Sequence, residues 1–133
     1  MANTQGINHL GLTVENLDES LAFFVDCLGF EASGRDDSYP RCAVSDGSCR
    51  LTLWQVDQYS PVTAFNRRNN IGLHHLALQV ESEDKLNELS QKANNHPNVT
   101  IEFTPELLGA GPRKHMMLLE PGGIRIELIW QGE

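Results

Sequence analysis

The chain has 133 residues, of which 40% are hydrophobic and 21% are charged, with a formal net charge of −8 and a pI of about 5.0. This length suits one ordinary domain, or two small half-domains that share a core. The acidic charge argues against nucleic acid or an anionic membrane as a partner, since both attract basic surfaces. A small neutral or cationic ligand remains compatible with it.

The cysteines and the N-terminus favour a cytoplasmic protein. Three cysteines without paired spacing, Cys27, Cys42 and Cys49, do not resemble a disulfide framework, so we expect reduced thiols. The segment Met1–Gly6 has no basic region followed by an apolar run, which predicts no signal peptide. No apolar run approaches the roughly 20 residues that span a bilayer, so we expect no membrane association.

The most informative feature is an internal repeat. Gly72–Val80 resembles Gly6–Val14 at an offset of 66 residues, and each copy alternates like a short strand with a histidine at the same place. Arg125–Ile129 likewise matches Arg50–Trp54 at an offset of 75. Similarity at both ends of the unit predicts a chain built twice from one supersecondary structure.

Each unit reads as a strand, a helix and three further strands. Asn16 and Ser82 are the expected helix N-caps. Asp46-Gly47 predicts a hairpin turn. We expect an α+β fold in one domain over residues 1–133, with two βαβββ modules in tandem whose curved mixed sheets form a cup-shaped metal or ligand site. The expected boundaries are module one 6–57, linker 58–71 and module two 72–131. The expected strands are 7–14, 30–35, 40–45, 49–56, 73–80, 99–104, 114–119 and 124–130.

The matched strands place polar residues on one side of each sheet. One face of each strand is apolar and should lie under a helix, whereas the opposite face carries His9, Thr52, His75 and Glu127. If the two sheets curve towards each other, these four positions converge. Two imidazoles and a carboxylate are a common donor set for Fe, Mn, Zn or Ni, and they leave coordination positions open for substrate.

Simpler interpretations exist for each residue alone. A single strand histidine is more often a hydrogen-bonded, partly buried residue. Glu127 could be a solvated carboxylate with Arg125 on the same face as an ion-pair partner. The equivalent positions in a duplicated unit favour the metal site. Because a hydroxyl is a poor metal ligand, Thr52 is expected to support the site or simply to pack.

These motifs resemble a known superfamily. Ile7–Val14, Leu17–Phe24 and Leu28–Phe30, together with the closing segment Leu119–Leu128, are similar to the opening and the end of vicinal oxygen chelate proteins. That superfamily includes glyoxalase I, bleomycin-resistance proteins, type I extradiol dioxygenases, methylmalonyl-CoA epimerase and fosfomycin-resistance thiol transferases. The resemblance implies paired βαβββ modules around a divalent metal.

The resemblance also implies His9, His75 and Glu127 as the ligands. Thr52 falls where typical glyoxalase I has a metal-binding glutamate, so the ligand set is more similar to dioxygenases and fosfomycin transferases. Many such dioxygenases have four modules rather than two. Residues 104–112 lack the Lys- and Ser-rich loop expected of the transferases.

The sequence therefore predicts a divalent-metal-dependent enzyme that acts on a small oxygen-chelating substrate as a lyase, isomerase, dioxygenase or thiol transferase. We expect a homodimer in which His9 comes from one chain and His75 and Glu127 from the other. His74 should point to the helix side. The remaining candidates are Glu127, His115 and Tyr39 for catalysis, and Thr52, Arg41, Arg113 and Trp54 for substrate binding or support of the site.

Two other functions fit the same sequence. One is a non-enzymatic ligand-binding or antibiotic-sequestering protein of the bleomycin-resistance type, for which Trp54 and Phe65 could line an aromatic cleft. The other is a regulatory or structural dimer with a vestigial site.

Overall fold

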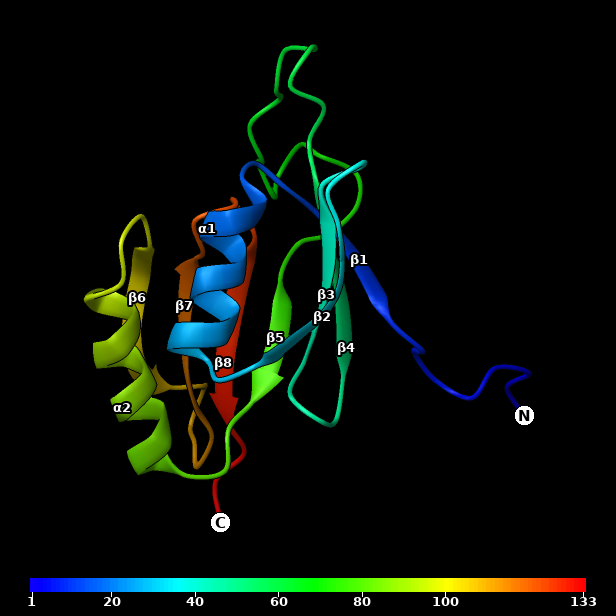
Figure 1. The fold of residues 1–133 in the computed structure, drawn as a ribbon. Helices are drawn as coiled ribbons and strands as arrows, with labels where there is room; N and C mark the ends of the chain where they lie inside the picture. Colours follow the sequence, from blue (N-terminus) through cyan, green and yellow to red (C-terminus); the bar gives the residue numbers. More distant parts are fainter.

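A computed structural model describes all residues, 1–133, and contains two four-stranded sheets (Figure 1). Their strand orders are β1-β4-β3-β2 and β5-β8-β7-β6, with β1 parallel to β4, β5 parallel to β8, and the other pairs antiparallel. The predicted α+β fold with two βαβββ modules is confirmed.

The first sheet and its helix comprise β1 (Leu10–Val14), α1 (Leu17–Ala22), β2 (Glu31–Asp36), β3 (Arg41–Ser45) and β4 (Arg50–Gln55). The second sheet and its helix comprise β5 (Leu76–Gln79), α2 (Glu83–Asn94), β6 (Thr100–Leu107), β7 (Lys114–Leu119) and β8 (Arg125–Trp130).

Both helices begin at the predicted caps. The Asn16 side chain accepts a hydrogen bond from the backbone N–H of Glu19, and the Ser82 hydroxyl accepts one from that of Lys85. Each contact satisfies a backbone donor that the helix itself cannot pair. After α1 the chain continues as one π-helical segment, Phe23–Cys27, before the short connection to β2.

The leading strand of each module is shorter than the sequence predicted. β1 begins at Leu10, which pairs with Leu51 at the start of β4, and the residues before Leu10 have no partner strand. β5 likewise begins at Leu76, opposite Ile126. His9 and His75 therefore precede their strands, and strand alternation alone does not determine which way the residues before Leu10 and Leu76 point.

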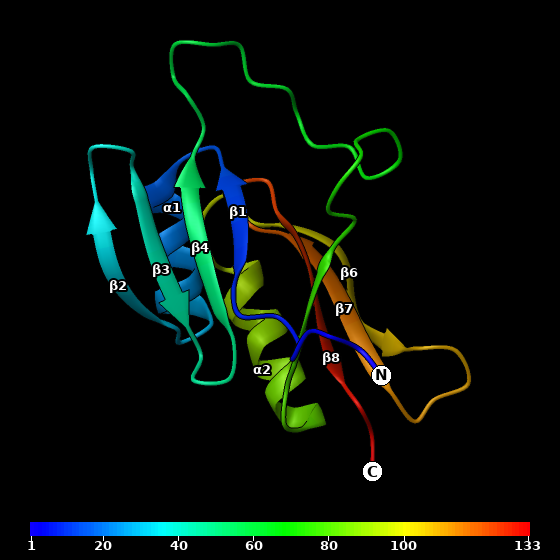
Figure 2. The ribbon, with the colours of Figure 1, turned by 90° about the vertical axis from the view of Figure 1, so that its right-hand side faces the viewer.

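The two modules share one hydrophobic core. Buried side chains of the first sheet and of the second belong to a single cluster that also includes the inner faces of both helices. Figures 1 and 2 show α1 and α2 in the angle between the sheets. Since both helix-covered faces point into this core, the helix-free faces lie on the outside of that angle and face different directions. The core strands contribute Leu12, Val14, Leu51, Leu53, Leu78, Ile126 and Leu128.

Polar contacts also join the modules. The Ser20 hydroxyl on α1 donates to Glu120 Oε2 at 3.0 Å, and the Glu15 N–H donates to the Gly122 carbonyl at 3.1 Å. Gly122 has no space for a side chain, because a Cβ there would lie 2.2 Å from Ser20 Oγ. Burial raises the pKa of the Glu120 carboxyl above its usual value, although hydrogen bonds from Gly122, Ile124 and Ser20 oppose the shift.

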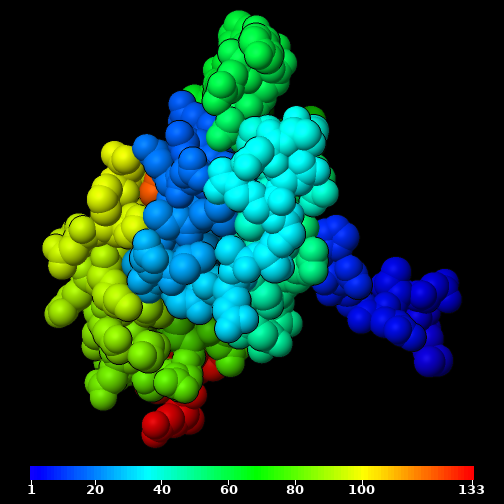
Figure 3. All heavy atoms as spheres, viewed as in Figure 1, coloured from blue at the N-terminus to red at the C-terminus, as the bar shows by residue number.

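Two segments project from this body. The residues before β1 extend away from it, and the connection between β4 and β5 forms a long excursion at one end (Figure 3). The three cysteines are unpaired. None of the helices has the length and the apolar composition needed to cross a membrane.

Candidate metal centre

Glu127 on β8 is the centre of a polar cluster on the helix-free face of the second sheet. Its Oε1 lies 3.3 Å from His75 Nε2, and its Oε2 lies 2.5 Å from His115 Nδ1. Glu127 is buried, and the His115 side chain is 13% exposed. Each carboxylate oxygen therefore faces one imidazole, in surroundings with little solvent to screen the interaction.

Strand pairing explains how these residues meet. Glu127 is paired with Met117 of β7, and His115 is two residues earlier on the same side of that strand. On the other flank Glu127 is paired with Ala77 of β5, which places His75 two residues before it. The sequence left the face of His115 open, and only the β7–β8 register determines it. The ring of Phe103 packs against His115 with centroids 4.9 Å apart.

His9 belongs to the other sheet and does not join this cluster. It is exposed just before β1, and its Nδ1 lies 2.8 Å from Asn8 Oδ1. Accordingly, the chain contains no group of three or more His, Cys, Asp or Glu side chains arranged to hold a metal ion. One chain thus separates the expected ligands into His9 on one side and His75 with Glu127 on the other.

The geometry of the second group fits a cation. Imidazole nitrogen and carboxylate oxygen bind Zn at about 2.0–2.2 Å. Two such donors on one ion, at bond angles between octahedral and tetrahedral values, lie roughly 3.0–3.4 Å apart. The 3.3 Å between His75 Nε2 and Glu127 Oε1 falls in that range. The hydrogen-bonded His115 would fix the carboxylate, as the outer partners of metal ligands commonly do.

The structure corrects the expectation for His74. Its Nδ1 lies 2.8 Å from Nδ1 of His75, so the ring lies beside the candidate ligand rather than on the helix side. The reason is that His74 occupies a bend before β5, where strand alternation does not apply. Loss of solvent around the ring, followed by repulsion from His75 and Arg125, lowers the pKa of His74 below its usual value.

Arg125 does not form the ion pair with Glu127 that the simpler interpretation of Glu127 offered. Its guanidinium binds Glu102 through two contacts, Nε to Oε1 at 2.9 Å and Nη2 to Oε2 at 3.0 Å. Glu102 lies where the pairing register of β6 with β7 shifts, between Ile101 and Phe103. The hydrogen bond from Arg125 lowers the pKa of the Glu102 carboxyl. The remaining guanidinium nitrogen, Nη1, lies 3.5 Å from His74 Nδ1.

Four other candidates come together on the first sheet. Trp54 donates its indole N–H to Thr52 Oγ1 at 3.0 Å, the Tyr39 ring meets the Trp54 ring edge-on at 4.9 Å, and Arg41 Cζ lies 5.3 Å from the centroid of the Trp54 ring. Gly11 gives them room, since a Cβ there would lie 3.3 Å from Thr52 Oγ1. These residues form an aromatic and cationic surface on the helix-free face, with no contact to Glu127.

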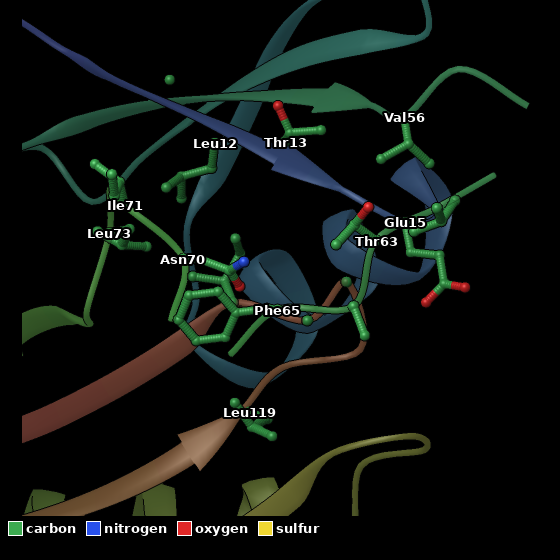
Figure 4. A pocket seen from close by; sticks show the side chains of 16 residues that line it. Leu12, Thr13, Glu15, Val56, Thr63, Phe65, Asn70, Ile71, Leu73 and Leu119 are labelled. Carbon is green, nitrogen blue, oxygen red and sulfur yellow. The ribbon is translucent and has the colours of Figure 1, made fainter. Parts of the chain in front are cut away.

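The last predicted residue, Arg113, has an exposed side chain in the connection from β6 to β7 and joins neither group. A separate cavity of about 490 Å³, which the sequence did not indicate, lies between the β4–β5 connection and the turn after β7 (Figure 4). Phe65, Leu73, Leu119 and Ile124 are among the residues that line it. The lining is largely apolar and includes none of the candidate metal ligands.

The chain belongs to the Glyoxalase/Bleomycin resistance protein/Dioxygenase superfamily, whose family model matches residues 6–128. Among curated proteins it is similar to Metapyrocatechase of Pseudomonas sp. (strain CF600), with 33% identity over 108 residues. That alignment covers 79% of this chain and 32% of the relative, so the chain spans about a third of the length of the curated protein it matches.

Solved structures show the same fold. A glyoxylase/bleomycin resistance protein/dioxygenase domain from Frankia sp. EAN1pec has 22% identity and a TM-score of 0.82, over 98% of this chain and 95% of that chain. Lactoylglutathione lyase from Agrobacterium tumefaciens has 18% identity and a TM-score of 0.70, over 97% and 96%. These similarities establish the architecture and leave the activity to the residues of the site.

Proposed function

We propose that this protein is a divalent-metal-dependent enzyme that acts on a small molecule with two neighbouring oxygen atoms, at a site shared between two copies of the chain. The observation that carries the proposal is the pairing of His75 Nε2 with Glu127 Oε1 at 3.3 Å, on the helix-free face of β5 and β8. His9 occupies the equivalent position of His75 in the first module, at the offset of the repeat.

The direction of the sheets supports a shared site. Because the helix-covered faces meet in one core, the His9 side and the Glu127 side of a single chain lie on the outside of the angle between the sheets and face different directions. Two copies related by a two-fold axis can place the first sheet of each chain opposite the second sheet of the other, which makes two equivalent sites. Two large apolar side chains support a covered surface, since Ile7, two residues before His9, and Ile71, four residues before His75, are almost fully exposed in one chain.

Each residue has a distinct part in such a site. His9, His75 and Glu127 would hold the cation, which supplies Lewis-acid chemistry to a chelating substrate. His115 would orient Glu127 through its Nδ1 contact and, as the imidazole nearest the carboxylate, is the candidate acid or base. Tyr39 is the second acid–base candidate, from the opposing sheet.

The surface around Trp54 indicates the kind of substrate. An indole flanked by a tyrosine ring and a guanidinium favours a flat molecule, because aromatic faces stack and Arg41 can balance a negative charge. The similarity to Metapyrocatechase makes catechols the first flat molecules with two neighbouring oxygens to test. Ring-opening dioxygenation is therefore the leading reaction, ahead of isomerisation, lyase chemistry and thiol transfer.

Oxygen uptake with catechol tests the proposal. Protein reconstituted anaerobically with Fe(II) and then exposed to air should consume oxygen and form a yellow ring-opened product. In Glu127→Ala the rate of oxygen consumption should be at least about tenfold lower, because the variant loses the metal. Glu88→Ala is the matched control, because Glu88 is an exposed helix residue paired with Lys85. Absence of turnover with catechols, glyoxal–thiol adducts and epoxide–thiol pairs, in protein that holds its metal, would refute the enzymatic proposal.

The ligand-binding alternative has one specific observation in its favour. Trp54 and Tyr39 present an aromatic surface on the first sheet that contacts neither His75 nor Glu127. If this is a sequestering protein, a planar aromatic drug should quench Trp54 fluorescence with the same affinity in wild type and in Glu127→Ala. Metal-dependent quenching by catechol would instead support the enzyme.

A further inference from the structure

The residue that precedes each candidate ligand histidine contacts the same ring atom in both modules. Asn8 Oδ1 lies 2.8 Å from Nδ1 of His9, and His74 Nδ1 lies 2.8 Å from Nδ1 of His75. Asn8 and His74 are equivalent positions of the repeat, 66 residues apart. Two chemically different side chains therefore make one contact at two duplicated places, which points to a shared role for that contact.

In the first module this contact determines where the ring proton is. The side-chain oxygen of Asn8 can only accept a hydrogen bond. Nδ1 of His9 must therefore carry the proton and donate it. A neutral imidazole has one protonated nitrogen, so the lone pair of His9 is on Nε2.

In the second module the direction is determined by a third residue. The contact joins two ring nitrogens, of which one must donate and the other accept. Arg125 Nη1 lies 3.5 Å from His74 Nδ1, and a guanidinium can only donate. A proton on His74 Nδ1 would face that cation, so His74 Nδ1 accepts and His75 Nδ1 donates. The lone pair of His75 is then on Nε2, which lies 3.3 Å from Glu127 Oε1. Two acceptors at that distance are stable when a cation lies between them, whereas without a cation Glu127 favours a proton on Nε2.

Arg125 is itself held firmly in place. It is 7% exposed, and two of its nitrogens are bound by the Glu102 carboxylate. A connected chain of contacts thus runs from Glu102 on β6 through Arg125 on β8 and His74 to His75. The first module needs no such chain, because the amide oxygen of Asn8 has no alternative role as a donor.

We propose that Asn8 and His74 are positioning residues that hold His9 and His75 in the Nδ1–H tautomer and direct both Nε2 atoms to the cation. This inference rests on the proposed metal site, yet it makes a separate statement about the metal-free protein. In the absence of metal, both rings should already carry their proton on Nδ1, because for His75 the shorter contact, 2.8 Å to His74 Nδ1, should outweigh the attraction of Glu127 Oε1, 3.3 Å away, for a proton on Nε2. Partners that fix ligand tautomers typically affect metal affinity by about 10- to 100-fold.

The test compares three substitutions by long-range ¹H–¹⁵N NMR of histidine rings in metal-free full-length protein, at about pH 8, where an ordinary imidazole is neutral. His74→Asn places the first module's residue in the second module, so His75 should keep its Nδ1–H signature. His74→Ala should give His75 a mixture of tautomers. His96→Ala is the control, because His96 packs edge-on against Phe23, away from the site.

Affinity for Zn(II), measured by competition with a chelating dye, is the second readout. His74→Ala should bind at least about tenfold more weakly than wild type, whereas His74→Asn should bind like wild type. A proton on Nε2 of His75 in wild type would overturn the proposal, and so would equal weakening by both His74 substitutions. If wild type binds no metal, the proposed function fails, while the NMR comparison still decides the positioning role.

Discussion

Pairs of inactive variants can show whether the metal site is built from two chains. His9→Ala removes the proposed ligand next to the first sheet, and Glu127→Ala removes a proposed ligand from the second. In a hybrid dimer one site combines the intact His9 of one chain with the intact His75 and Glu127 of the other, whereas the second site lacks both residues. The hybrid therefore regains one of its two sites.

Random pairing of equal amounts should restore about a quarter of the wild-type metal, since about half of the dimers are hybrids and each has one complete site. Co-expression with two different affinity tags isolates the hybrids, which should then contain about one ion per dimer. The assay is elemental mass spectrometry after tag removal, with each variant alone as the control. Hybrids without metal, beside a wild type that binds it, would refute the shared site and require all ligands to meet within one chain.

Three further predictions concern stability and the aromatic surface. The raised pKa of Glu120 means that the folded state holds this proton more tightly than the unfolded state does, so the free energy of unfolding should fall as pH rises above about 4.5. In urea titrations, the stability of Glu120→Gln relative to wild type should therefore increase with pH. A pH-independent difference would contradict this. Gly122→Ala should lower the free energy of unfolding by about 1–3 kcal/mol, because its Cβ would lie 2.2 Å from Ser20 Oγ and 2.7 Å from Val14 Cβ. An unchanged free energy of unfolding in urea titrations would contradict the close packing at this position. Trp54→Leu should weaken catechol binding about tenfold, as followed by calorimetry, while Zn(II) affinity stays unchanged.

Much of the fold could be predicted because the sequence contains the same module twice. The offset of 66 residues aligned the leading strands and both helix caps, and the two closing strands matched at an offset of 75. Asp46-Gly47 forms the expected turn between β3 and β4, with the Asp46 carboxylate accepting from Ser48 and Cys49 N–H groups at 2.8 Å. These are local signals, determined by residues close in sequence.

The strand boundaries were less accurate because they depend on distant partners. The residues before Leu10 alternate like a strand, yet β4 has no residues paired opposite them. The same effect moved the start of β5 to Leu76 and left His74 in a bend beside His75. β6 continues to Leu107, beyond the predicted end at Thr104, because its pairing with β7 extends to Lys114.

The candidate site also has features that the sequence predicted and others that depend on the pairing of distant strands. The repeat predicted that His75 and Glu127 share one side of their sheet, and the structure brings the two side chains to 3.3 Å from each other. The contact of His115 with Glu127 could not be predicted, since it depends on the β7–β8 register. Similarly, the charge of Arg125 indicated an ion pair, and only the position of Glu102 on β6 shows which carboxylate it binds.

We propose above that His9, His75 and Glu127 together hold a divalent metal ion. The metal content of untagged protein, measured by elemental mass spectrometry for wild type beside Glu127→Ala, shows whether they do. We predict close to one ion per chain in wild type and a large loss in the variant, because removal of a carboxylate ligand lowers affinity by at least about tenfold. Wild-type protein that holds no metal after incubation with Fe(II), Mn(II), Ni(II) and Zn(II) in turn would contradict the account.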